Sequence, residues 1–162
     1  MQRQDYLNAI GEHMYQGEVL GEAVFARFLA LEKDPERRYK WGTLMQLETE
    51  TKARLRPFLT RLGIPIEEAD VAARVEEFSK DYNSKSWAEQ MQTIAEVTSY
   101  YLERFREIEA AAPPTEREVA HSMIVHEQAL HDFAKKELAG DAKHSLRDVI
   151  EQLKYPLALA TG

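Results

Sequence analysis

Hydrophobic residues recur at spacings of three and four along most of the chain, which is the pattern of amphipathic helices. The pattern is interrupted at four short stretches where glycine and proline cluster: EKDPE, LGIP, AAPPT and LAGDA. Between these breaks there is no run of alternating β-branched residues long enough to indicate a sheet. The sequence therefore predicts an all-α protein.

The breaks define two pairs of long helices. We expect the first helix over residues 5–31, and the second from an N-cap at Asp34 to a stop at Gly63. Capping-box sequences predict the starts of the other two, with SWAE beginning at Ser86 and TERE beginning at Thr115. Each pair is joined by a short connection, so its two helices should run antiparallel.

Shorter elements fill the rest of the chain. Residues 66–81 predict a crossover helix between the second and third long helices, and residues 145–153 predict a short C-terminal helix. The final YPLALATG reads as an apolar tail laid on the bundle. A chain of 162 residues with 44% hydrophobic residues is long enough for one sizeable core. We therefore expect one domain over residues 1–162, a four-helix bundle with up-down-down-up connectivity.

Three glutamates interrupt the apolar stripes near their midpoints. Glu127, within MIVHEQALHDF, stands where the fourth long helix should carry a leucine, and Glu18 and Glu48 have the same place on the first and second. A lone carboxylate in a core would cost several kcal/mol or become protonated. Such residues are normally paired, hydrogen-bonded or bound to a metal, so these three are candidates for a buried site.

The amino-acid composition excludes several kinds of metal site and disfavours some classes of binding partner. The chain has no cysteine, so disulfides, iron–sulfur clusters and thiolate zinc sites are excluded and a metal would be bound by oxygen and nitrogen. A formal charge of −7 without a basic stripe disfavours nucleic acid and anionic membranes. No signal peptide or membrane span is recognised. We expect a cytoplasmic protein whose partner is a small-molecule substrate or ligand, and leave a homodimer open.

Four segments, in their order along the chain, resemble a known superfamily: GEVLGEAVF, LMQLETET, IAEVTSYYLERF and VHEQALHDF. They resemble the ferritin-like di-iron carboxylate proteins, most closely the rubrerythrin and aldehyde-deformylating oxygenase branches. The resemblance covers residues 7–138 and depends on helix order and carboxylate spacing. It implies a ferritin-like bundle that binds two iron or manganese ions and uses oxygen or peroxide to oxidise a small substrate.

The resemblance also implies a set of metal ligands: Glu18, Glu48, Glu96 and Glu127. The two histidines of the family are replaced here by Thr51 and Leu130. His131 lies four residues after Glu127 and shares its helix face, so the fifth ligand is expected there.

Alternatives remain open for the site and for the function. The apolar face of the third long helix turns Thr98 rather than Glu96 toward the core, which would leave three glutamates at the centre. His126 flanks its stripe and is expected at the surface or between helices, and Lys52 is expected at the surface. The missing histidines also fit a bundle that has lost its metals and keeps its core carboxylates as a hydrogen-bonded network with a binding or structural role.

Overall fold

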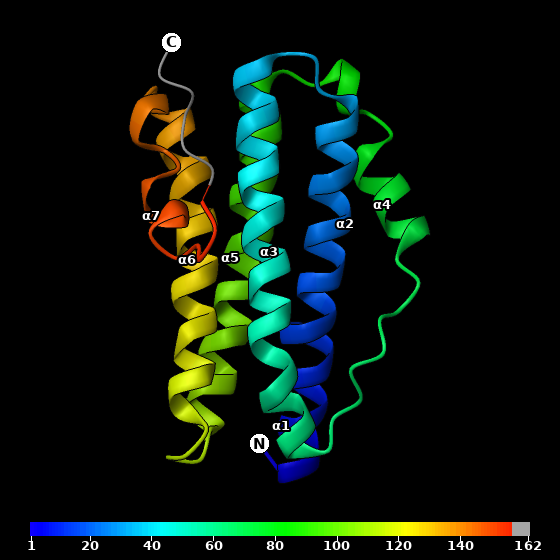
Figure 1. Cartoon of the computed structure of the whole chain (residues 1–162), viewed down its shortest axis with the longest axis vertical. Helices are drawn as coiled ribbons and strands as arrows, with labels where there is room; N and C mark the ends of the chain where they lie inside the picture. The colour runs from blue at the N-terminus through cyan, green and yellow to red at the C-terminus, as the bar shows by residue number, and fades with distance from the viewer. Residues whose placement is uncertain (157–162) are drawn as a thin grey trace.

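Four long helical segments lie side by side and form the body of the molecule (Figure 1). The computed structural model describes residues 1–156, and this part of the chain contains helices and no strand, which confirms the all-α prediction for it. The helices are α1 (Arg3–Ala9), η1 (Ile10–Tyr15), α2 (Gln16–Leu31), α3 (Pro35–Leu62), α4 (Ala72–Ser79), η2 (Tyr82–Ser84), α5 (Trp87–Ala111), α6 (Arg117–Leu138), η3 (Ala142–His144) and α7 (Arg147–Ile150).

The direction of each long segment can be followed by colour in Figure 1. The first segment and α6 run upward, whereas α3 and α5 run downward. Helix α2 packs against α3, and α5 packs against α6. After α3 the chain returns along the outside of α2 through α4, so that α5 begins at the same end of the molecule as α3. Two antiparallel pairs joined by one long crossover result.

The crossover contains less helix than the sequence predicts. Residues 64–71 are not helical, and α4 occupies only Ala72–Ser79. Most of this segment is exposed, so little packing is available to stabilise a helix there. Its backbone is instead held by the side-chain amide of Gln16, which donates to the carbonyl of Glu67 (2.8 Å) and accepts from the N–H of Ala69 (3.0 Å).

The ends of α3 and the start of α5 agree with the sequence predictions. Asp34 caps α3 by accepting a hydrogen bond from the backbone N–H of Arg37 (2.9 Å). Gly63 ends this helix with a φ of 70°, a left-handed conformation that glycine adopts without a steric penalty. The capping box of α5 is formed between Ser86 and Glu89.

The start of α6 differs from the prediction. Glu116, and not Thr115, is the N-cap, and no side chain caps the helix there. The Glu116 carboxylate accepts two hydrogen bonds from Arg3 (3.0 and 3.1 Å). The expected capping box is therefore not formed, and the N-cap residue instead contacts the other end of the chain, which a local pattern does not predict.

The first long segment is not a continuous α-helix. Residues Ile10–Tyr15 form a π-helix, whose wider turn shifts the faces of the residues on either side relative to an α-helix. Ile10, Met14 and Tyr15 are buried within it. This segment ends three residues before Glu18, so it sets the direction in which that side chain points.

One polar layer divides the core into two apolar clusters. The first cluster includes Leu20, Phe28, Trp41, Leu44, Met91, Leu130 and Phe133. The second includes Ile10, Met14, Leu55, Leu59, Phe105 and Met123. On each long helix the boundary between them falls at buried polar residues: Glu18 on α2, Glu48 and Thr51 on α3, Thr98 on α5, and His126 and Glu127 on α6. Three buried glutamates and a buried histidine thus lie at one level of the fold.

The C-terminal part of the chain contains less helix than the sequence predicts. The predicted helix 145–153 is reduced to α7, Arg147–Ile150, and most of the predicted apolar tail lies outside the described residues.

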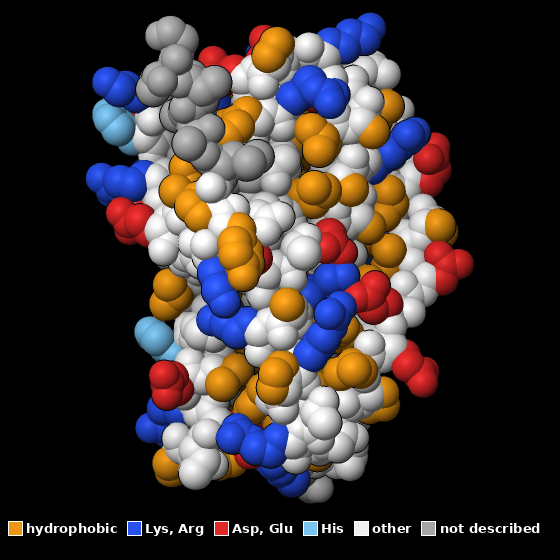
Figure 2. Space-filling view, in the orientation of Figure 1, with side chains coloured by type: hydrophobic (Ala, Val, Ile, Leu, Met, Phe, Trp, Pro, Cys, Tyr) orange, Lys and Arg blue, Asp and Glu red, His pale blue; other side chains and the backbone are white. Residues whose placement is uncertain are grey.

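The surface is of mixed character. On the face shown in Figure 2, acidic and basic side chains lie interspersed among apolar ones. Within residues 1–156, none of the helices combines the length and the apolar character that crossing a bilayer requires.

Candidate metal centre

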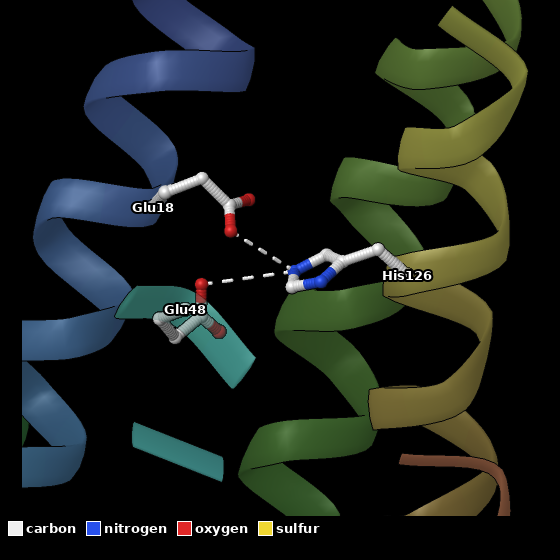
Figure 3. Close-up of side chains that lie close together, drawn as sticks. All are labelled: Glu18, Glu48 and His126. Carbon is white, nitrogen blue, oxygen red and sulfur yellow. Dashed lines mark ion pairs between the residues drawn. The ribbon is translucent and has the colours of Figure 1, made fainter. Parts of the chain in front are cut away.

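Three helices bring two carboxylates and one imidazole together in the polar layer. Glu18 comes from α2, Glu48 from α3 and His126 from α6, and all three side chains are buried (Figure 3). The Nε2 atom of His126 lies 3.2 Å from Oε2 of Glu18 and 3.7 Å from Oε2 of Glu48. Each residue offers one ligand atom within 4.8 Å of the others. Ligand atoms around one ion are separated by about 3–4 Å when metal–ligand bonds are about 2.1 Å long, so the spacing suits a metal ion.

Two of these facing atoms lack a hydrogen bond. Both Nε2 of His126 and Oε2 of Glu18 are buried, and no protein donor or acceptor satisfies either of them. Unsatisfied buried polar atoms cost about 1–3 kcal/mol each and call for an explanation such as an ion. The imidazole is fully buried, so bulk solvent does not reach Nε2. Binding of a metal would satisfy both atoms at once.

The other ring nitrogen of His126 is held by Thr51. Its Nδ1 lies 3.1 Å from the hydroxyl oxygen of Thr51 on α3. When Nδ1 carries the proton and donates to this oxygen, Nε2 presents its lone pair to the two carboxylates. Thr51, at the position where the resemblance places a histidine, thus fixes the orientation of a histidine that comes from another helix.

Burial and mutual repulsion change the protonation of the acids. Burial raises the pKa of Glu18 to about 7, although a hydrogen bond with Glu48 works in the opposite direction. Burial and the charge of Glu18 raise the pKa of Glu48 well above its ordinary value. Burial together with the charges of Glu48 and Glu18 also raises the pKa of Glu127. Without a metal, the carboxyl groups of Glu18 and Glu48 therefore share a proton near neutral pH.

The pKa of His126 is shifted in the opposite direction. Burial lowers the pKa of His126, while the negative charge of Glu48 opposes this effect. The imidazole therefore stays neutral at pH 7, which is the form that binds metals.

The structure brings together only part of the set expected from the sequence. Glu18, Glu48 and Glu127 all lie in the polar layer, as predicted. Glu96 is exposed and accepts a hydrogen bond from Gln92 (2.8 Å), because the inward position at this level of α5 belongs to Thr98.

His131 does not approach the carboxylates either. Its Nδ1 lies 3.0 Å from the hydroxyl oxygen of Thr98 and 3.2 Å from the carbonyl oxygen of Ala95, so the ring faces α5. Successive residues on a helix are separated by about 100°, and α5 rather than the cluster lies on the side to which His131 points.

His126 is the member of this group that the predicted ligand set left out. Of its two expected places, at the surface or between helices, the structure confirms the second, because no part of the side chain is exposed. A signal was present in the sequence, since Met123, His126, Leu130 and Phe133 follow one another at helical spacing and are all buried. This stripe overlaps the one through Glu127, and a single sequence does not show which of the two faces the other helices.

A buried lysine beside the cluster is a further correction. Lys52 is buried and not at the surface, and it forms ion pairs with Glu22 and with Glu68 (2.7 Å). Its charge is thereby taken up by two carboxylates outside the cluster. It does not neutralise Glu48 by a direct contact.

A glycine on α2 makes room for one of the carboxylates. A Cβ atom added at Gly21 would lie 2.8 Å from Cδ of Glu48 and 3.0 Å from each of its carboxylate oxygens. Real Cβ atoms do not approach carboxylates so closely, so Glu48 keeps this position only because residue 21 has no side chain.

We expect Gly21→Ala to destabilise the protein by about 1–3 kcal/mol, because its methyl group would displace the buried Glu48 carboxyl group. Gly42→Ala is the matched control, since that added Cβ would meet only Leu29, at 4.0 Å. The control should be stabilising by up to about 1 kcal/mol, the helix preference of alanine over glycine. Denaturant-induced unfolding measures both. Equal effects of the two substitutions would show that Glu48 does not depend on the space above Gly21.

A cavity of about 90 Å³ adjoins the carboxylates between α2 and α5. Its apolar wall includes Leu20, Val24, Phe25, Ile94, Val97 and Phe105. Glu18, Glu48 and Glu127 line its polar part. Tyr101 also lines it, and burial raises the pKa of its phenol, with a smaller contribution from the charge of Glu127. A small, largely apolar molecule would fit beside the acids.

Comparison of the chain with protein-family models, with curated proteins and with solved structures finds no match. Glu18, Glu48 and His126 form a buried group that could hold a metal ion.

Proposed function

We propose that this chain is a ferritin-like metalloprotein that binds iron or manganese and uses oxygen or peroxide to oxidise a small substrate. The observation that carries the proposal is the buried Nε2 of His126, which has no hydrogen-bond partner and faces two buried carboxylates from other helices. The course of the four long segments, with its crossover between the second and third, supports the ferritin-like assignment.

The donor set favours these two metals. Carboxylate oxygens suit manganese and magnesium, whereas imidazole suits iron, zinc and other transition metals. Two carboxylates with one imidazole, and with positions left for water or substrate, combine both preferences. The absence of cysteine removes the thiolate ligands that would favour copper(I) or structural zinc.

A bound iron or manganese ion would supply the redox chemistry and would polarise a bound oxygen or peroxide. The residues of the chain would bind the ion, orient its ligands and exclude water. Glu18 and Glu48 would give up their shared proton and provide the negative charge, while Thr51 keeps the Nε2 atom of His126 in position. The apolar wall of the cavity excludes water and accommodates the substrate beside Glu127.

A metal-free bundle is the second candidate. It is favoured by the hydrogen bond between the carboxyl groups of Glu18 and Glu48, whose raised pKa values allow them to share a proton without a metal. Thr51 and Leu130, at the positions of the family's histidines, agree with loss of an ancestral site. Its function would lie in binding or assembly.

Metal analysis separates the two candidates. The protein should be produced with iron and, separately, with manganese, as the wild type and as Glu48→Ala, and its metal content measured after gel filtration. The matched control is Glu96→Ala, which makes the same substitution at an exposed glutamate of a long helix. We expect near-stoichiometric metal in the wild type and the control and its loss in Glu48→Ala. Background metal in every preparation would instead establish the metal-free candidate.

A further inference from the structure

The polar layer contains fewer donors than a two-metal site of the ferritin-like plan requires. That plan uses four carboxylates and two histidines, with every long helix contributing. Here the layer offers three carboxylates, from Glu18, Glu48 and Glu127, and one imidazole. Helix α5 contributes Thr98, whose hydroxyl donates to the carbonyl of Ile94 (2.8 Å).

The remaining candidates for a second ion are already engaged or are apolar. The hydroxyl of Thr51 is hydrogen-bonded to Nδ1 of His126, and Leu130 is a buried aliphatic side chain. His131 is turned to Thr98. A second ion would therefore take most of its ligands from water, beside a cavity whose wall is largely apolar.

Only three of the four donors converge on one point. Glu18, Glu48 and His126 have ligand atoms within 4.8 Å of one another, and Glu127 is not part of this group although it follows His126 directly. Neighbouring residues of a helix point about 100° apart, so Glu127 and His126 reach different sides of the layer. Glu127 lines the cavity, as Glu18 and Glu48 do, but is not part of the group of converging ligand atoms.

The charges of the proposed ligands also favour a single ion. The ionised carboxylates of Glu18 and Glu48 supply two negative charges, which one divalent ion neutralises. A second would leave an excess of positive charge in a buried site, which is strongly unfavourable.

We infer that each chain binds a single divalent ion through the carboxylates of Glu18 and Glu48 and the Nε2 of His126, and that Glu127 is not one of its ligands. This inference rests on the proposed function, because it concerns the number of ions and the ligand set of that site.

Titration of the metal-free, full-length protein with Mn²⁺ tests the number. Bound and free Mn²⁺ are measured by equilibrium dialysis, and the bound ion is observed by electron paramagnetic resonance. We expect saturation at one Mn²⁺ per chain, with the spectrum of an isolated ion throughout. Two ions per chain with an exchange-coupled spectrum would overturn the inference and leave the proposed function intact. No binding of Mn²⁺, or of Fe²⁺ under anaerobic conditions, would overturn both.

Two isosteric variants test the ligand set. Glu18→Gln should weaken Mn²⁺ binding at least about 100-fold, more than the loss of an outer hydrogen-bond partner, whereas Glu127→Gln should change it by less than about 10-fold. Circular dichroism confirms that both remain helical, and if Glu18→Gln fails to fold, the stoichiometry of Glu127→Gln decides. One ion per Glu127→Gln chain at near wild-type affinity supports the inference. Loss of the ion from this variant would show that Glu127 is a ligand.

Discussion

Replacing His126 by alanine should lower the affinity for Mn²⁺ or Fe²⁺ at least about 100-fold, whereas replacing His131 by alanine should leave it nearly unchanged. The two histidines are on the same helix, five residues apart, and the sequence favoured the second as a ligand. In the structure only His126 faces Glu18 and Glu48, while His131 is hydrogen-bonded to Thr98. His131→Ala is therefore both the control and a direct test of the sequence prediction.

Dialysis against buffered Mn²⁺ measures the affinity of each variant. Loss of metal from His126→Ala could also follow from a disturbed core, because the side chain is fully buried. Added imidazole separates these causes, since the alanine leaves a space of about the size of the ring in which free imidazole can bind and restore the nitrogen donor. Recovery of metal binding with imidazole is the expected result. A greater loss in His131→Ala than in His126→Ala would refute the site as described.

The metal-free protein should become less stable as the pH rises from about 5 to about 8. The unfolded chain releases the proton of Glu18 near pH 4.5, whereas the folded protein keeps it until about pH 7. In this window the folded state binds more protons, so the free energy of unfolding falls with increasing pH, by about 3 kcal/mol for this group alone. The raised pKa values of Glu48 and Glu127 act in the same direction.

His126 opposes this trend only at the acid end of the window. Its pKa is lowered by burial, so below its ordinary value of 6.5 the unfolded chain binds a proton that the folded protein does not, and stability falls toward acid pH. The raised pKa values of Glu18, Glu48 and Glu127 have the opposite effect on stability to that of this one histidine. The carboxylates with lowered pKa values, such as Glu68 and Glu116, gain their protons at pH values below the window.

Urea-induced unfolding at several pH values measures the effect. Glu18→Gln should reduce the slope, because a neutral amide takes the place of a group that resists ionisation. Saturating Mn²⁺ should reverse it, since the ion binds the deprotonated ligands of the folded state and is favoured as the pH rises. If the free energy of unfolding of the metal-free protein instead increased from pH 5 to pH 8, the pKa values of these acids would not be raised in the folded state.

The helices and their ends illustrate how far local patterns reach. Asp34, Gly63 and Ser86 were placed correctly because each stabilises backbone groups within a few residues of itself. Thr115 was placed wrongly, since Glu116 is the N-cap and its carboxylate bonds to Arg3, more than a hundred residues away. The crossover is less helical than expected. Part of its backbone is hydrogen-bonded to the side chain of Gln16, which belongs to another segment, and a local pattern does not show this contact.

The sequence by itself determined the all-helical architecture, the breaks between helices and the burial of Glu18, Glu48 and Glu127, because all of these follow from periodicity along one helix. Only the tertiary structure decided that His126, and not His131 or Glu96, joins the carboxylates. The choice depends on how α6 is rotated against α3 and on the π-helical turn before Glu18, which are set by packing between helices. His126 and His131 are five residues apart and point about 140° apart around α6, so the rotation of this helix decides which of them faces the carboxylates, and no local pattern encodes that rotation.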